Sequence, residues 1–311
     1  MKIDLSNAVS AIDPSLIQQL RRLSLAFIIS GVLSMVLLFI GINQYNPSTP
    51  VFSQVFFSLL AICLVVSLLS YFLYNKKVSE QIRAPFISDL CSLYSFKYSQ
   101  ECYFPVEEFN ALSLFDRGTR VESEDEIKGS LSSGIFSCRE LRVYKKADRK
   151  ADGAETMIFS GDLYRFSLPK LLDFDFQIGP DFSESLLGQV GQKLQVISGR
   201  LSTKQVLYLD NKEFESYFKV ESTNESATRK MLTPHFQKSL LSLRQSLVKI
   251  HPSATIYLKP HNEYLYLLIS GSSDKFNMGF MPSRIIPNLQ SDLFLISSVL
   301  EVADSLDYSN S

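Results

Sequence analysis

The stretch that decides the fold is Leu23–Ile42, LSLAFIISGVLSMVLLFIGI, twenty residues without a charged side chain. At a helical rise of about 1.5 Å per residue, it matches the roughly 30 Å hydrocarbon layer of a bilayer. A second charge-free stretch, Val51–Leu73, follows after a short connection that contains Pro47 and Pro50. Lipid offers the backbone no hydrogen-bond partners, so both stretches are predicted to be transmembrane helices that form a hairpin.

The basic residues beside the two stretches predict their orientation. Arg21 and Arg22 precede the first stretch, Lys76 and Lys77 follow the second, and the connection contains no Lys or Arg. Because cytoplasmic flanks carry the excess of Lys and Arg, both termini are predicted to be cytoplasmic. We therefore expect a multi-pass protein of the cytoplasmic (inner) membrane, with the lipid bilayer as its first partner.

Three other interpretations of the apolar stretches fit the sequence less well. A cleaved signal peptide would have a shorter apolar core, of about 7–15 residues, and a small-residue cleavage site. Core helices of a soluble domain would not need two charge-free runs flanked by cations. A transport pathway usually carries charged residues within the membrane, and neither stretch has one. Ser30 and Ser34 are predicted to seat the second helix, with self-association of the spans as the alternative.

The rest of the composition excludes several function classes. The 31 basic and 32 acidic residues nearly cancel, which does not support a nucleic-acid-binding surface. The four cysteines show no CxxC spacing, so neither a disulfide framework nor a zinc site is indicated. Nucleotide-binding, metalloprotease, serine-hydrolase and EF-hand motifs do not occur. We expect no cofactor, no metal and no motif-defined catalytic residue.

The chain divides by composition into a membrane part and one large domain of α+β class. We predict an N-terminal segment (1–22), transmembrane helices (23–42 and 51–73) joined by an external loop (43–50), a helical linker (74–95) and a cytoplasmic domain (96–311). A weak subdivision near residue 205 is compatible with the pattern. The domain is expected to be a mixed, mainly antiparallel sheet covered by helices.

The periodicity of apolar residues supplies the individual elements. The predicted strands are Ala111–Phe115, Glu140–Lys145, Thr156–Phe166 with a bulge at Gly161, Gln205–Leu209, a short extended Lys219–Glu221, and Ala254–Leu258 with Tyr264–Ile269 as a hairpin around Pro260-His261-Asn262. The predicted helices are Ser79–Ser95, Ser183–Lys193, Asn211–Phe218, a helix capped by Asn224, one starting at Thr233-Pro234, and one after Asn288. Lys146–Glu155 is interpreted as an exposed hairpin loop. The acidic run Glu122–Glu126 is interpreted as a solvated loop, with a hard-cation site as the alternative.

Two stretches of the domain carry a resemblance to a known family. One is the strand Ile158–Leu163 (IFSGDL), and the more distinctive one is Leu209–Pro234 (LDNKEFESYFKVESTNESATRKMLTP). Together with the order of basic flank, two spans and cytoplasmic domain, they make the chain similar to the bacterial family called domain of unknown function 3137. The resemblance implies an inner-membrane, cytoplasm-facing protein and implies no activity. The chain departs from the family pattern at Asn224-Glu225-Ser226, where an Asp-Gln-like pair is expected.

The same stretch contains the candidate site. Phe214 and Phe218 are spaced to bury their rings where a helical turn passes into a strand, and Arg229 can pair with Glu225 at i, i+4. This corner of the domain is interpreted mainly as part of the core. The alternative is a ligand-binding or partner-binding corner centred on Arg229.

We therefore predict a non-enzymatic, membrane-tethered binding, scaffold or sensor module that contacts a protein partner or a second copy of itself. The alternative function is an enzyme that acts on a lipid headgroup or a nucleotide with dispersed catalytic residues. The two differ in what the folded domain should present. An enzyme predicts a cleft with converging ionisable groups, whereas a binding module predicts an exposed apolar patch or strand edge.

Overall fold

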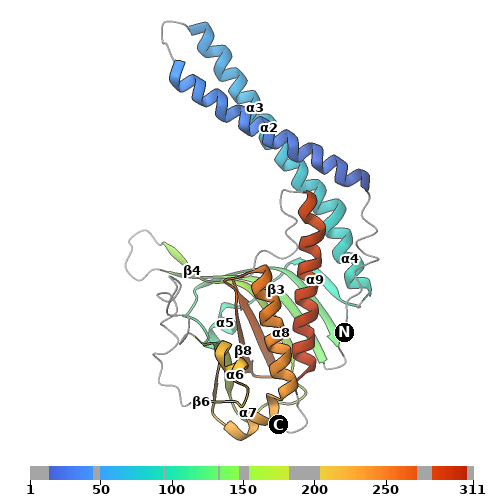
Figure 1. Cartoon of the computed structure of the whole chain (residues 1–311), viewed down its shortest axis with the longest axis vertical. Coiled ribbons are helices and arrows are strands. Elements are labelled where there is room, and N and C mark those ends of the chain that lie inside the picture. The colour runs from blue at the N-terminus through green and yellow to red at the C-terminus, as the bar shows by residue number, and fades with distance from the viewer. Residues whose placement is uncertain are drawn as a thin grey trace. The chain divides into compact units, whose positions relative to one another are not determined.

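The computed structural model divides into two compact units (Figure 1). The helical unit contains Asp4–Leu90 and Phe276–Gln290, and the sheet unit contains mainly Cys91–Lys275 and Ser291–Ser311. The structure describes residues 14–44, 50–93, 95–131, 134–146, 154–181, 204–271 and 282–306. The predicted helix Ser183–Lys193 and most of the two predicted loops, 43–50 and Lys146–Glu155, lie outside these residues.

The helical unit is built on two long helices, α2 (Pro14–Gln44) and α3 (Pro50–Val78). A π-helical turn, η1 (Ser79–Arg83), follows, and then α4 (Ala84–Leu93), so the segment predicted as the helix Ser79–Ser95 is largely helical. α2 and α3 pack along each other through small residues, as predicted for Ser30 and Ser34, which are both buried. The Ser67 hydroxyl donates to the Phe27 carbonyl oxygen at 3.4 Å across this interface.

Three described helices are long and apolar enough to cross a membrane: Ser15–Gly41, Gln54–Asp89 and Pro282–Asp304. In each of the first two, only 17% of the most apolar window is buried within the fold, whereas in the third 47% is buried. The apolar residues of the third helix, α9 (Pro282–Asp304), are therefore largely used for packing in the protein. α9 starts six residues before the predicted closing helix and contains Pro287.

Among the described residues, the sheet unit contains a nine-stranded sheet in which every pairing is antiparallel. In spatial order the strands are β1 (Lys97–Glu101), β2 (Arg120–Leu131), β3 (Gly134–Lys146), β4 (Glu155–Ser167), β9 (Tyr264–Ser270), β8 (Thr255–His261), β5 (Phe176–Pro180), β7 (Phe218–Ser222) and β6 (Gln205–Leu207). The predicted α+β class with a mainly antiparallel sheet is confirmed.

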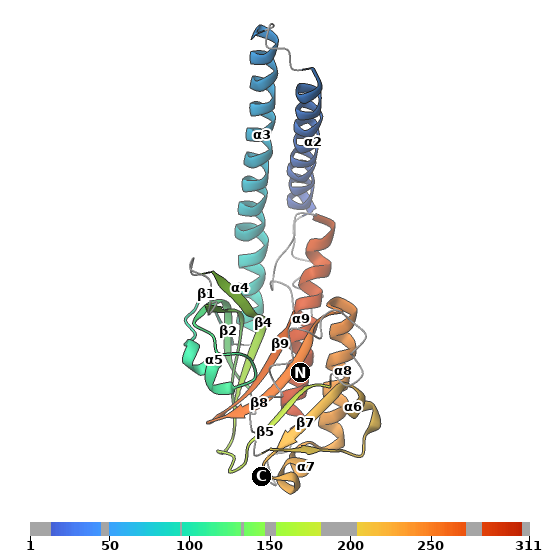
Figure 2. The same cartoon turned by 90° about the vertical axis from the view of Figure 1, so that its left-hand side faces the viewer.

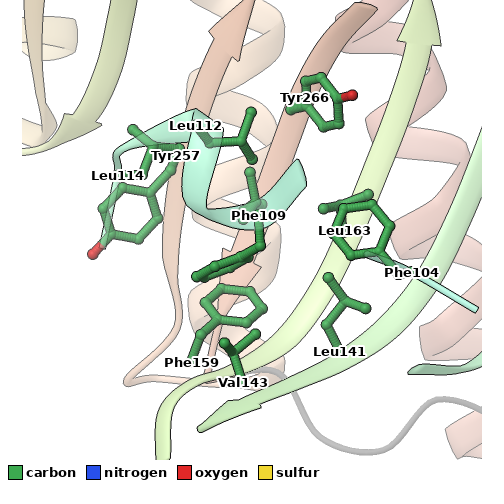
Figure 3. Packing of buried hydrophobic residues seen from close by; sticks show 11 residues of the cluster. Phe104, Phe109, Leu112, Leu114, Leu141, Val143, Phe159, Leu163, Tyr257 and Tyr266 are labelled. Carbon is green, nitrogen blue, oxygen red and sulfur yellow. The ribbon is translucent and has the colours of Figure 1, made fainter. Parts of the chain in front are cut away.

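Helices cover both faces of this sheet (Figures 1 and 2). On one face, α5 (Val106–Leu112) closes an apolar cluster, in which the ring of Phe109 lies 5.6 Å from that of Phe159 (Figure 3). On the other face lie α8 (Pro234–Ile250) and the Ser291–Asp304 part of α9. Side chains alternate between the faces along each strand, so the central strands contribute to both cores.

The helices α6, α7 and α8 each begin with a side-chain cap, as the sequence predicts. Asn211 accepts from the Phe214 N–H at the start of α6 (Lys212–Tyr217), at 3.1 Å. Asn224 and Thr233 make equivalent bonds, also of 3.1 Å, at the starts of α7 (Glu225–Met231) and α8.

Two predictions of element type are wrong. Ala111–Phe115 is not a strand, because Pro105 and the acidic residues Glu107 and Glu108 start helix α5, which ends at Leu112. The acidic run Glu122–Glu126 is not a solvated loop, because it lies inside β2. Strands β1 and β5 were not predicted; β1 is short and mostly exposed, and in β5 the alternation of Phe176–Ile178 ends at Gly179 and Pro180.

Two predicted features, the β8–β9 turn and the bulge of β4, lie at other residues than predicted. The β8–β9 turn lies at Asn262-Glu263, since His261 pairs with Tyr264, and Asn262 adopts the left-handed φ of 54° that suits a two-residue turn. Gly161 is not the bulge of β4, because it pairs in register with Leu141, and the register shift falls nearer the β3–β4 turn. Gly161 is required instead by a close approach: a Cβ there would collide with the Ile269 carbonyl oxygen.

Candidate functional site

The predicted corner around Arg229 is formed by α6, β7 and α7. Phe214 and Phe218 are buried, with ring centroids 5.0 Å apart, so both rings belong to the core. This agrees with the interpretation of the corner as part of the core. The aromatic residues therefore position the corner and offer no surface to a ligand.

The predicted pair between Arg229 and Glu225 is formed. Arg229 Nε donates to Glu225 Oε1 at 2.8 Å, and the two side chains are 37% and 61% exposed. Arg229 also donates to the backbone carbonyl of Tyr208, whose side chain is exposed. The guanidinium thus joins α7 to the chain after β6. Binding of a partner at this corner stays a prediction.

The four cations of the predicted membrane flanks lie on the two long helices. Arg21, Arg22 and Lys76 are exposed, and Lys77 Nζ donates to Gln19 Oε1 at 2.5 Å. This bond places the beginning of α2 beside the end of α3. All four cations are therefore at the same end of the helix pair.

The acidic run of β2 supplies a buried ion pair. Glu126 and Arg139, on adjacent strands β2 and β3, pair with side chains only 7% and 3% exposed. Lys128 contacts the second oxygen of Glu126 at 2.7 Å, and the Arg139 guanidinium lies 5.1 Å from the Phe104 ring centroid. These contacts tie the segment before α5 to the sheet. No group of three or more His, Cys, Asp or Glu placed to hold a metal occurs among the described residues.

A second group of polar side chains lies on the α5 side of the sheet, next to the apolar cluster. We call it the polar floor; its members are Asp175, Gln177, Lys204, Lys219, Glu221 and Lys259. Lys259 lies on β8, Gln177 lies on β5, and Asp175 immediately precedes β5. The Lys219–Glu221 pair lies on β7. Sequence motifs do not reveal this group, because its members are scattered along the chain between positions 175 and 259. The one local signal is Lys259, a lysine within the otherwise uncharged strand TIYLKPH.

The polar floor is joined by a chain of short contacts. Lys204 Nζ lies 2.6 Å from Asp175 Oδ2 and donates to Gln177 Oε1 at 3.3 Å. Gln177 Nε2 in turn donates to Glu221 Oε2 at 2.5 Å, and Lys219 holds the other oxygen of Glu221 at 2.6 Å. At the opposite end, Lys259 Nζ reaches Asp175 Oδ2 at 3.8 Å. Two ammonium groups therefore share one carboxylate.

Burial of Lys259 makes its charge costly. Its side chain is only 9% exposed, and this desolvation, together with the nearby Lys204 ammonium, lowers the pKa of Lys259 to about 8. Asp175 acts in the opposite direction without restoring the ordinary value. Lys259 does not itself line a cavity, but Asp175, the carboxylate that it contacts, does. Perturbed ionisable groups of this kind are common at functional sites.

A cavity of about 470 Å³ opens on Asp175. It is lined by Leu171, Leu172, Asp173, Phe174, Asp175, Thr223, Pro260, His261 and Asn262. The backbone of Asp175 is held by Thr223, because the Asp175 N–H donates to Thr223 Oγ1 at 2.9 Å and the Thr223 N–H donates to the Asp175 carbonyl at 2.9 Å. The carboxylate that the two lysines share is thus fixed at the wall of a cavity that can hold a small ligand.

Comparisons with known proteins give a family and no activity. Comparison with curated proteins gives no match. Among solved structures, the chain is similar to the mycobacterial trehalose monomycolate transport factor A, TtfA, at 8% identity and a TM-score of 0.33, covering 67% of this chain and 90% of that one. Residues 157–307, which contain β4, the polar floor and the Arg229 corner, match the model described as "Protein of unknown function (DUF3137)". The domain that these residues form belongs to that family, as the resemblance in its sequence predicts.

Proposed function

We propose that this protein is a membrane-tethered binding module, with α2 and α3 in the cytoplasmic membrane and the sheet unit in the cytoplasm. The observation that carries the proposal is the outward surface of the two helices. Large apolar side chains such as Met35, Phe39 and Leu68 are 75%, 70% and 68% exposed. Apolar patches of this size on a protein surface require cover, and a bilayer supplies it along the whole length of both helices.

The direction of insertion follows from the four cations at one end of the helix pair. By the positive-inside rule, these cations favour the cytoplasmic side of the membrane. They are Arg21, Arg22, Lys76 and Lys77. The sheet unit follows α3 directly, so it is assigned to the same side. In this proposal both termini are cytoplasmic and the 45–49 connection is external.

Cysteine labelling tests the topology. A variant without its four native cysteines would receive one new cysteine, either Ser48→Cys in the connection or Ser309→Cys near the C-terminus. In intact cells, a membrane-impermeant maleimide should label the first and should label the second only after permeabilisation. Labelling of residue 309 in intact cells would refute the orientation, and extraction of the protein by alkaline carbonate would refute the tether.

The role of the sheet unit is binding, of a protein partner or a second copy through its surface, or of a small ligand at the polar floor. Native mass spectrometry of the full-length protein in detergent separates these outcomes. A retained protein or a defined homo-oligomer supports a scaffold, whereas a monomer that carries a small molecule supports a ligand sensor. A bare monomer under all gentle conditions would contradict both.

A second candidate function is an enzyme that acts on a lipid headgroup or nucleotide. The observation in its favour is Lys259, because an amine with a pKa of about 8 is partly neutral near physiological pH and is then nucleophilic. Release of a headgroup or of phosphate by the purified protein, abolished in Lys259→Met, would establish the enzyme. Binding without turnover would favour the module.

A further inference from the structure

The polar floor lacks one acceptor. Among the described residues, the only carboxylate within 4.0 Å of Lys259 Nζ is Asp175, at 3.8 Å, and Lys204 already holds the same oxygen at 2.6 Å. An ammonium group has three donors, and a buried one is costly unless they are matched. The Lys259 and Lys204 ammonium groups also repel each other. An additional anionic oxygen beside the two lysines would relieve both costs.

The carboxylate of Asp175, in turn, lacks one hydrogen-bond donor. Asp175 Oδ1 is buried and has no hydrogen-bond partner among the described residues, although Oδ2 contacts both lysines. A buried carboxylate oxygen without a donor is destabilising, because it has lost its water and gained no hydrogen bond in return. A ligand that satisfies the floor must therefore bring both an acceptor for Lys259 and a hydroxyl for Asp175.

The cavity limits the charge of such a ligand. Asp173 lines the same cavity as Asp175, and its carboxylate opposes a ligand with two negative charges. His261 and Asn262 add polar groups to the wall, and Leu171 adds an exposed apolar edge. A volume of about 470 Å³ lies within the usual range of small-ligand pockets. A singly charged group with hydroxyls fits these constraints better than a free dianion.

We propose that the polar floor binds a hydroxylated phosphodiester, with the phosphodiester oxygens against Lys259 and Lys204 and a hydroxyl donating to Asp175 Oδ1. The same chemistry occurs in a water-soluble glycerol phosphodiester and in a glycerol-bearing lipid headgroup. The assignment rests on the proposed function in that it treats the sheet unit as a binding module. It adds the class of ligand and the residues that contact it.

Binding has a defined pH dependence. The bound phosphodiester stabilises the charged form of Lys259, so ligand binding raises the pKa of Lys259 above about 8. By linkage, the affinity is full below the free pKa of Lys259 and falls as the pH rises through it. Lys204, Asp175 and Tyr266 are the other charged or titratable groups around Lys259, and Tyr266 is the residue on β9 that pairs with Lys259. Asp173 and His261 lie on the cavity wall.

The test uses the full-length protein in nanodiscs of zwitterionic lipid. Glycerophosphoglycerol is added as the soluble probe, glycerol as the uncharged control, and phosphatidylglycerol is incorporated in a second nanodisc preparation. The readouts are calorimetric affinity and the pKa of Lys259, followed by side-chain NMR of isotope-labelled lysine. Loss of one charge-assisted contact in Lys259→Met or Lys204→Met should weaken binding about tenfold or more.

Lys238→Met is the matched control, because Lys238 is an exposed lysine of α8 and is not a member of the polar floor. It should bind like the unmodified protein. Binding of the soluble probe identifies a free phosphodiester, and a Lys259 pKa shift only with phosphatidylglycerol identifies the headgroup. No binding of either probe at about 10 mM, a level that detects even millimolar affinity, would overturn the proposal.

Equal affinity in Lys259→Met, Lys204→Met and Lys238→Met would also overturn it. Thermal unfolding of each variant shows whether the fold is intact, and the Lys259 titration in the otherwise unmodified protein does not depend on any variant. A correctly inserted protein that fails these tests would retain the proposed tether and lose only the assigned ligand. An incorrect topology with intact phosphodiester binding would do the reverse.

Discussion

Replacing Glu126 by Gln removes the negative charge from the buried pair of β2 and β3. Arg139 is 3% exposed, so its guanidinium cannot turn to water when the charge is lost. Its remaining contacts, the Tyr103 carbonyl oxygen at 3.3 Å and the Phe104 ring, carry no charge. Removing one member of a buried ion pair lowers the free energy of unfolding by about 3–5 kcal/mol. Because Gln retains one acceptor oxygen, we expect Glu126→Gln to lower it by about 3 kcal/mol.

The double variant Glu126→Met with Arg139→Met tests the origin of this cost. Replacing both members of a buried ion pair by apolar side chains is often close to neutral, so the double variant should lose less than about 1.5 kcal/mol. Its loss should therefore be smaller than that of either single variant. Such a pattern is a coupling between the two side chains and not a sum of independent effects.

Denaturant unfolding of the full-length protein in detergent measures these differences. The chain contains no Trp, so the tertiary structure is followed by near-UV circular dichroism of its 14 Tyr residues. Glu122→Gln in the same strand is the control, because its pair with Arg120 is about half exposed and should cost less than about 1 kcal/mol. A Glu126→Gln loss below about 1 kcal/mol, or additive effects in the double variant, would refute the reasoning.

Four further predictions test other parts of the fold and the site. Lys259→Met should raise the free energy of unfolding at pH 7 by about 1–3 kcal/mol, because folding lowers the pKa of Lys259 and the folded state therefore binds fewer protons than the unfolded chain. For the same reason, the unmodified protein should gain stability between about pH 8 and 10. A series of unfolding measurements without that gain would contradict the argument from burial. Gly161→Ala should cost at least about 2–3 kcal/mol, since the added Cβ meets the Ile269 carbonyl, and a near-neutral thermal shift would show that β9 can move aside. Thr233→Ala should cost about 1 kcal/mol by removing the cap of α8, with Thr233→Ser as the retained-cap control in the same unfolding assay. Phe214→Ala should cost about 3–5 kcal/mol and Glu225→Ala less than about 0.5 kcal/mol; the reverse order in denaturant midpoints would contradict the assignment of this corner to the core.

Local features of the sequence predict local structure well in this chain. The caps at Asn211, Asn224 and Thr233 are predictable because a cap is a bond between residues three positions apart. The pair of Arg229 with Glu225 is predictable for the same reason, since i, i+4 residues meet on any helix. The two long apolar helices follow from an uninterrupted composition, which does not depend on the remaining chain.

The burial of the acidic run of β2 depends on a partner on another strand, whereas the wrong strand at Ala111–Phe115 overlooked a signal close by in the sequence. The acidic run of β2 is typical of a loop because four carboxylates in five residues favour water, and only Arg139 on the neighbouring strand permits the burial of Glu126. The prediction of a strand at Ala111–Phe115 is wrong because the helix signal lies upstream of it, in Pro105 and the two glutamates that follow.

The sequence by itself determined the two long apolar helices, the charge asymmetry of their flanks, the class of the domain and its family. Each of these depends on composition or on spacings of a few residues, which fold does not change. Only the tertiary structure decided which charges are buried and which residues form the polar floor. Lys259 lies on β8, Asp175 precedes β5 and Lys204 precedes β6, and the three come together because the sheet has the strand order β8-β5-β7-β6. This order is set by long-range pairing that no local pattern encodes.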